Sequence, residues 1–176
     1  MKDIREIKAG KKTLKRDYLS LMMWFMGRAI QTAAAMDQAV KKEFGELPER
    51  FTFCLSVMPA GPHMIIGKSK RGIVHYLGWE PEGKDISLKM KIKNIEAAIL
   101  IFTFQESTAV ATAQDRLIVD GEVSHACAIV RILDVVEVYL LPKFIAKLAV
   151  KRYPAQFSGG KFFGRIWFYI RTIFGF

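Results

Sequence analysis

The chain has few of the residues that build metal centres, disulfide frameworks and hydrolytic sites. It contains two cysteines and three histidines in 176 residues. Cys54 and Cys127 have no metal or redox spacing and lie in apolar runs, so we expect two reduced, buried thiols and a cytoplasmic protein. His63, His75 and His125 lack partners at metal-site spacing, and the scattered carboxylates suggest no general acid–base pair. We therefore expect no catalytic residue, no metal, no cofactor and no enzyme activity.

Long uninterrupted apolar runs are also missing. The run LSLMMWFM begins at Leu19, and Arg28 and Gln31 interrupt its continuation, whereas a spanning helix needs about 20 mostly apolar residues. The basic start of the chain is not followed by a convincing cleavage site, so we expect no signal peptide. Hydrophobic residues nevertheless make up 51% of the chain, which is ample for one core and too much for a disordered protein.

Acidic residues are scarce at both ends of the chain. The net charge is +10, of which residues 1–16 carry +5 and residues 138–176 carry +7, leaving −2 for the middle. Such ends attract either nucleic acid or an anionic membrane surface. No nucleic-acid recognition motif accompanies the basic residues, while aromatic residues accompany those at the C-terminal end. We therefore expect an anionic membrane as a partner and no nucleic acid.

Hydrophobic spacing predicts a long helix followed by strands. Residues 14–43 form one helix ended by Gly45 and Pro48, a core helix or, alternatively, a membrane-facing or dimer-forming one. Strict alternation predicts strands at 51–58 and 85–93 and a hairpin at 63–69 and 72–79, together an antiparallel meander. The apolar stripe of the helix consists of Tyr18, Met22, Phe25, Ala29, Ala33, Met36 and Val40.

The period then changes to that of helices. We expect helices at 94–102, with Asn94 as the N-cap, at 107–114, at 122–141 and at 143–153, and a short strand at 116–121. Pro154 and the glycines at 159 and 160 form a hinge before the tail. The chain divides into a basic arm and N-terminal helix (1–45), a central domain (46–153) and a tail (154–176).

The tail, KFFGRIWFYIRTIFGF from residue 161, combines basic and aromatic residues. Helical spacing puts Lys161, Arg165, Arg171 and Thr172 on one stripe, with Phe168 beside it, and places most apolar residues opposite. That pattern is typical of a helix lying in a membrane interface. A helix packed on the domain and a helix in a partner's groove are the alternatives. The residues predicted to contact a peripheral membrane are Lys161, Phe162, Phe163, Arg165, Trp167, Ile170, Arg171 and Phe174.

The segment from Asp85 to Leu133, DISLKMKIKNIEAAILIFTFQESTAVATAQDRLIVDGEVSHACAIVRIL, resembles the second half of a sterol carrier protein domain of the type-2-like lipid-binding family. An alternating strand introduced by Asp85 leads into a helix, then into a short alanine-bearing helix, and then into a strand with Gly121 before a long helix. The strands from Phe51 onward also match the order of the family. The resemblance covers roughly residues 46–141.

This resemblance implies an α+β fold, with a mostly antiparallel sheet of about five strands covered on one face by helices. It also implies non-catalytic binding, and transfer, of a sterol, a fatty acyl chain or a phospholipid in an apolar tunnel. A filled core is the alternative for each wall residue. An accessory or scaffold protein that presents a lipid-like substrate or binds a partner helix is the other candidate, and a homodimer or a partner enzyme fits either. The expected ligand-binding residues are Phe53, Leu55, Leu88, Met90, Ile99, Phe102, Ile129, Leu133 and Val136.

Overall fold

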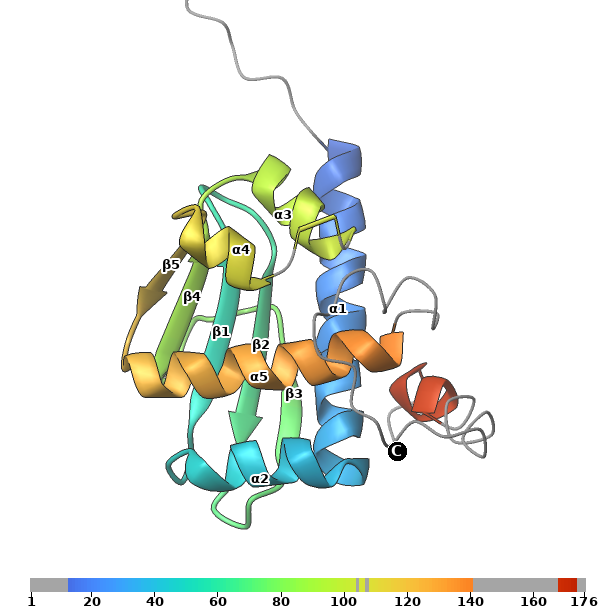
Figure 1. Cartoon of the computed structure of the whole chain (residues 1–176), viewed down its shortest axis with the longest axis vertical. Coiled ribbons are helices and arrows are strands. Elements are labelled where there is room, and N and C mark those ends of the chain that lie inside the picture. The colour runs from blue at the N-terminus through green and yellow to red at the C-terminus, as the bar shows by residue number, and fades with distance from the viewer. Residues whose placement is uncertain (1–12, 104, 107, 141–167, 174–176) are drawn as a thin grey trace, which may run out of the picture.

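A five-stranded sheet forms one layer of the protein, and helices cover one of its faces (Figure 1). The computed structural model describes residues 13–103, 105–106, 108–140 and 168–173. The strand order is β3-β2-β1-β4-β5, and three of the four pairings are antiparallel. The predicted α+β fold with a mostly antiparallel sheet is therefore confirmed. The strands are β1 (Thr52–Val57), β2 (His63–Lys68), β3 (Val74–Gly78), β4 (Leu88–Ile92) and β5 (Leu117–Asp120).

The first four strands do not form the predicted antiparallel meander. β4 pairs in parallel with β1, where Phe53 lies beside Leu88 and Leu55 beside Met90. The connection 79–87 leaves β3 at the sheet edge, passes behind the strands in Figure 1 and ends where the Ser87 N–H donates to the Thr52 carbonyl at 2.9 Å. The prediction was wrong because alternation specifies which face a side chain takes, but not which strand lies next to it.

The predicted N-terminal helix is two helices, α1 (Thr13–Met36) and α2 (Gln38–Glu46), separated by Asp37. Asp37 has an extended backbone, and its side chain accepts hydrogen bonds from the N–H groups of Ala39 at 2.7 Å and Val40 at 3.1 Å. An aspartate in this N-cap arrangement satisfies donors that a new helix would otherwise leave unpaired. The cap therefore explains why the chain turns here although the apolar spacing continues.

The remaining helices follow the sequence prediction closely. α3 (Ile95–Phe102), α4 (Thr108–Ala113) and α5 (Val123–Leu140) occupy the expected segments. Asn94 is the N-cap of α3, as predicted, because its side-chain oxygen accepts from the Ala97 N–H at 2.8 Å. α5 crosses in front of the strands and buries the apolar face of the sheet (Figure 1). The predicted helix at 143–153 and the hinge at 154–160 lie outside the described residues.

The two cysteines differ in exposure. Cys54 is buried in β1, as expected, but Cys127 is exposed on α5, so the prediction of two buried thiols was wrong for Cys127. On a helix, residues two apart are separated by about 200°, so Cys127 points away from the buried Ile129. Burial raises the pKa of the Cys54 thiol, which Lys89 and Lys91 partly offset.

Gly27 allows α1 to approach β3 closely. A Cβ at Gly27 would lie 2.5 Å from Cδ2 of the Tyr76 ring and 3.2 Å from the Met64 Cγ. We expect Gly27→Ala to lower the free energy of unfolding by about 1–2 kcal/mol, because overpacking outweighs the gain in helix propensity. Urea unfolding would measure this. The matched control is Gly45→Ala in α2, where a Cβ meets nothing within 4 Å, so an unchanged or higher stability is expected there. Equal effects of the two substitutions would contradict the packing argument.

Candidate functional site

The nine predicted ligand-binding residues come together in one apolar cluster. Phe53 and Leu55 on β1 lie next to Leu88 and Met90 on β4, and these four side chains share the covered face of the sheet. Each is at most 5% exposed. Parallel neighbours in register always present their side chains to the same face, which is why the two strands build one continuous apolar surface.

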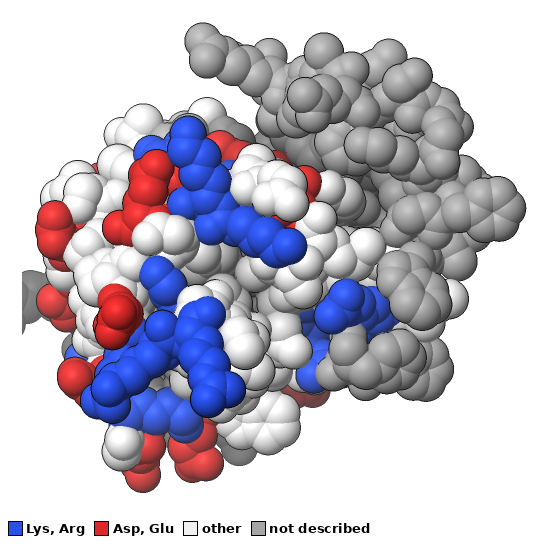
Figure 2. All heavy atoms as spheres, turned by 90° about the horizontal axis from the view of Figure 1, so that it is seen from below, with Lys and Arg blue, Asp and Glu red and all other residues white. Residues whose placement is uncertain are grey.

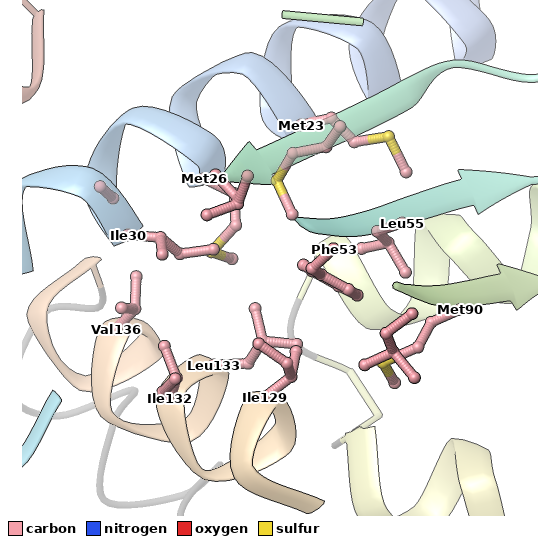
Figure 3. Packing of buried hydrophobic residues seen from close by; sticks show 14 of the residues in the cluster. Met23, Met26, Ile30, Phe53, Leu55, Met90, Ile129, Ile132, Leu133 and Val136 are labelled. Atoms are coloured by element: carbon pink, nitrogen blue, oxygen red, sulfur yellow. The ribbon is translucent and has the colours of Figure 1, made fainter. Parts of the chain in front are cut away.

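Two helices supply the opposite layer of the cluster. Ile129, Leu133 and Val136 project from α5, and Phe102 projects from α3, all buried, while Ile99 of α3 is half-buried and packs against them. Figure 3 shows the α5 side chains pointing toward Phe53, Leu55 and Met90 of the sheet. The structure thus brings the predicted residues together. Their role in holding a ligand stays a prediction.

α1 is a core helix, as predicted, but its first half buries other residues than those expected. Its buried side chains include Leu19, Met23, Met26 and Ile30, and Figure 3 shows Met23, Met26 and Ile30 directed into the same cluster. The predicted stripe is correct at Ala29, Ala33 and Val40, which are fully buried. In the first half of α1 it is one residue off, because Tyr18, Met22 and Phe25 were chosen in place of the buried Leu19, Met23 and Met26. The helix is apolar around most of its circumference, so periodicity alone did not select the correct face in that half.

Two surface cavities lie beside this cluster, and neither is lined by any of the nine residues. The first has a volume of about 420 Å³ and lies between α1, α2 and the hairpin of β2 and β3. The second, of about 560 Å³, lies between the start of α1, the β1–β2 turn and the end of β3. Both volumes fall within the range of small-molecule sites.

The second cavity combines an aromatic wall with polar groups. Arg16, His63, Tyr76 and Trp79 line it, and Trp79 is 67% exposed. Within the described residues, the buried His63 Nδ1 has no hydrogen-bond partner. Burial raises the pKa of Tyr76, and Arg28 acts in the opposite direction. Such a surface can take up a ring or an apolar chain.

Two carboxylates lie on the covered side of α5. Glu137 is 7% exposed, and burial raises its pKa to about 7, with Asp134 adding to the shift and a hydrogen bond with Thr108 opposing it. Burial also raises the pKa of Asp134. A protonated carboxyl is easier to bury than a carboxylate, so this part of α5 is neutral over a wider pH range than its sequence suggests. The sequence places Glu137 in the predicted helix at 122–141, but the spacing of residues does not indicate that its side chain is buried.

The described part of the tail packs on the domain. Residues 168–173 are helical, and Phe168 stacks on Tyr139 of α5 with ring centroids 4.9 Å apart. Thr172 is fully buried, and its carbonyl accepts a hydrogen bond from Arg28 Nε at 3.2 Å. The Tyr169 hydroxyl lies 3.0 Å from the Tyr139 carbonyl oxygen. Thr172 of the predicted stripe, and Phe168 beside it, therefore face the domain.

Of the eight predicted membrane-contact residues, the structure describes Ile170 and Arg171. Ile170 is 37% exposed, and its neighbour Ile173 is 52% exposed. These two side chains thus lie on the side of the tail helix that does not face the domain. The other six lie outside the described residues: Lys161, Phe162, Phe163, Arg165, Trp167 and Phe174.

Among the described residues, no three His, Cys, Asp or Glu side chains gather where they could hold a metal ion. Among those residues, too, no helix is both long and apolar enough to cross a membrane.

Comparisons with known proteins find similarity only in structure. No family model matches the chain, and no curated protein shows significant sequence similarity to it. A solved structure described as "UbiJ-SCP2 Ubiquinone synthesis protein" is 14% identical, with a TM-score of 0.43, and covers 70% of this chain and 95% of its own. Two structures of SCP2-like 2 from Aedes aegypti also match. All three are SCP2 domain proteins.

The first of the two mosquito structures is a solution NMR structure of the palmitated protein, 13% identical with a TM-score of 0.37, covering 56% of this chain and 93% of its own. The second is a crystal structure, 10% identical with a TM-score of 0.33, covering 55% of this chain and 94% of its own. The chain is similar in structure to these SCP2 domain proteins.

Proposed function

We propose that this protein binds a lipid through its apolar interior and carries out no chemistry on it. The observation that supports the proposal best is the convergence of α1, α3, α5 and the covered face of the sheet on one apolar cluster. Each CH₂ group of a ligand that moves from water into this cluster contributes about 0.8 kcal/mol to the free energy of binding.

The side chains of the cluster suit a ligand of variable shape. Met23, Met26, Met64 and Met90 are each at most 3% exposed and belong to the cluster. Methionine is unbranched and flexible, so a wall that contains several of them can repack around an acyl chain or a sterol. Two cavities of about 420 and 560 Å³ beside the cluster offer starting points for entry.

Peripheral membrane contact through the tail forms the second part of the proposal. The described tail helix turns Ile170 and Ile173 away from the domain, and the C-terminal end of the chain carries a strong positive charge. Exposed apolar side chains next to basic residues stabilise a helix at an anionic membrane surface, with about 1 kcal/mol from each nearby Lys or Arg. Such contact would be reversible and sensitive to salt.

Lipid retention tests the proposal directly. We expect native mass spectrometry of the purified protein to show an added mass, and organic extraction to release close to one lipid per chain. Delipidated protein should take up a fluorescent fatty acid, and saturating ligand should raise the melting temperature because it binds only the folded state. An empty protein that takes up neither fatty acid nor sterol would contradict lipid binding. Stoichiometric co-purification of a protein without lipid would favour the scaffold alternative.

A further inference from the structure

The charged side chains that line the cavity between α1, α2 and the β2–β3 hairpin are all positive. Lys41 from α2, Lys68 from β2 and Arg71 from the hairpin turn line it, and no Asp or Glu is among the described residues that do so. Figure 2, which shows this end of the molecule from below, has Lys and Arg side chains gathered in groups, with Asp and Glu side chains at their margins. Three cations from three elements around about 420 Å³ create a positive potential within it.

The Glu43 carboxylate of α2 is directed away from the cavity. Glu43 accepts hydrogen bonds from Arg131 Nε at 2.9 Å and Nη2 at 2.8 Å. That bond raises the pKa of Arg131, and Glu46 acts on the guanidinium in the same direction. Glu43 is thus directed to α5, whereas Lys41 and Gly45 line the cavity. Among the described residues that line the cavity, no carboxylate offsets the three cations.

The three cations are available to a ligand. Lys68 Nζ donates to the carbonyl oxygens of Phe44 at 2.7 Å and Leu47 at 2.6 Å. Because an ammonium has three donors, the end of α2 fixes Lys68 in place and leaves one donor over. Lys41 and Arg71 are exposed, and neither forms an ion pair with another described residue.

The wall of the cavity is apolar and continues into the core. Phe44 and Val74 line the cavity and also belong to the buried cluster, with exposures of 3% and 6%. A ligand with its charged group among the three cations would therefore place its apolar part against residues of the core. A small inorganic anion would leave that apolar wall in contact with water.

We propose that this cavity binds the phosphate or carboxylate group of an anionic amphiphile, held by Lys41, Lys68 and Arg71, with its apolar part against Phe44 and Val74. The inference rests on the proposed lipid binding and adds to it the charge and position of the head group. Charge-assisted hydrogen bonds to an oxyanion are stronger than neutral ones, so the site distinguishes anionic from neutral ligands.

Gly45 allows a matched test of the charge. It lines the cavity, and a Cβ there meets nothing within 4 Å, so Gly45→Glu and Gly45→Gln are expected to fold. The two variants differ only in the negative charge that they place beside the cations. The ligands are oleoyl lysophosphatidate, neutral monoolein with the same chain, and inorganic phosphate, measured by calorimetry below the micellar concentration.

The wild-type protein and Gly45→Gln should bind the lysophosphatidate about tenfold more tightly than monoolein, and Gly45→Glu should remove that preference without weakening monoolein binding. Arg71→Gln should weaken the binding of the lysophosphatidate alone. Phosphate should bind far more weakly than the lysophosphatidate.

Each contrary result of this experiment would overturn a different part of the proposals. Equal affinities for the two lipids in wild type would overturn the head-group site and leave lipid binding intact. Binding of neither lipid would overturn both proposals. Phosphate binding as tight as lysophosphatidate binding, lost in Gly45→Glu, would overturn the amphiphile and identify the ligand as a free anion.

Discussion

Replacing Glu137 by Gln is expected to raise the free energy of unfolding by about 3 kcal/mol at pH 8 and to leave it nearly unchanged at pH 4. Among the described carboxylates, Glu137 has the largest shift in pKa, because its side chain is buried and Asp134 repels its charged form. Gln retains the size of the side chain and can still form a hydrogen bond with Thr108, but it cannot ionise.

The direction of the pH dependence follows from the raised pKa. In the unfolded chain Glu137 loses its proton near pH 4.5, whereas in the folded protein it keeps the proton up to about pH 7. The folded state therefore gains most from this group below pH 4.5 and loses that advantage as the pH rises to about 7. Above that pH the wild-type protein contains a buried carboxylate and is correspondingly less stable than the variant.

Urea unfolding at pH 4, 5, 6, 7 and 8 would measure the effect, since urea does not screen charge. Glu82→Gln is the matched control, because Glu82 is exposed in the connection between β3 and β4 and its replacement should leave the free energy of unfolding nearly unchanged. If Glu137→Gln and the wild-type protein have parallel stability profiles between pH 5 and pH 8, Glu137 is ionised in the folded state and the burial argument fails.

Local patterns in the sequence predicted the elements of this fold well. The strict alternation around Leu88 and Met90 gave a strand that the structure contains, and Asn94 was correctly identified as a helix cap. Both features depend on residues within one element and its first neighbour. Asp37 is the exception, since the apolar spacing on either side of it concealed an N-cap that its residue type could have suggested.

Contacts between elements were harder to predict. Nothing in the alternation of β1 or β4 indicates that they pair in parallel, because the long connection 79–87 determines which strand becomes the neighbour. The buried face was misjudged in the first half of α1, where both sides of the helix are apolar, and was correct at Ala29 and Ala33. Cys127, by contrast, could have been placed outside the core from its position opposite Ile129 on the helix.

In the candidate site, too, features within one element were predicted and contacts between elements were not. Period-two and helical spacing identified Phe53, Leu55 and Met90 as inward side chains, and the structure gathers them with α5 residues. The cationic cavity gave no sequence signal, because Lys41, Lys68 and Arg71 come from three separate elements. Only the folded chain shows that the Glu43 carboxylate of α2 is directed toward Arg131 and away from those cations.

The tail offers a test in which stability and membrane affinity should respond to different residues. Phe168 and Thr172 face the domain, at 2% and 0% exposure, whereas Ile170 and Ile173 face outward. Inserting the exposed parts of these two isoleucines into a membrane interface is worth about 1 kcal/mol each. The double variant Ile170→Ser/Ile173→Ser is therefore expected to lower partitioning into anionic vesicles about 30-fold.

Phe168→Ala is the contrasting variant, because Phe168 stacks on Tyr139 and its loss leaves a cavity. It should lower the free energy of unfolding by about 3 kcal/mol, whereas the double isoleucine variant should leave that free energy nearly unchanged. Co-sedimentation with vesicles containing anionic lipid, together with urea unfolding, separates the two effects. Unchanged vesicle binding in the isoleucine variant would exclude this part of the tail from membrane contact. A loss of stability in that variant as large as in Phe168→Ala would show that both faces of the helix pack on the protein, and the outward face would then be part of the fold.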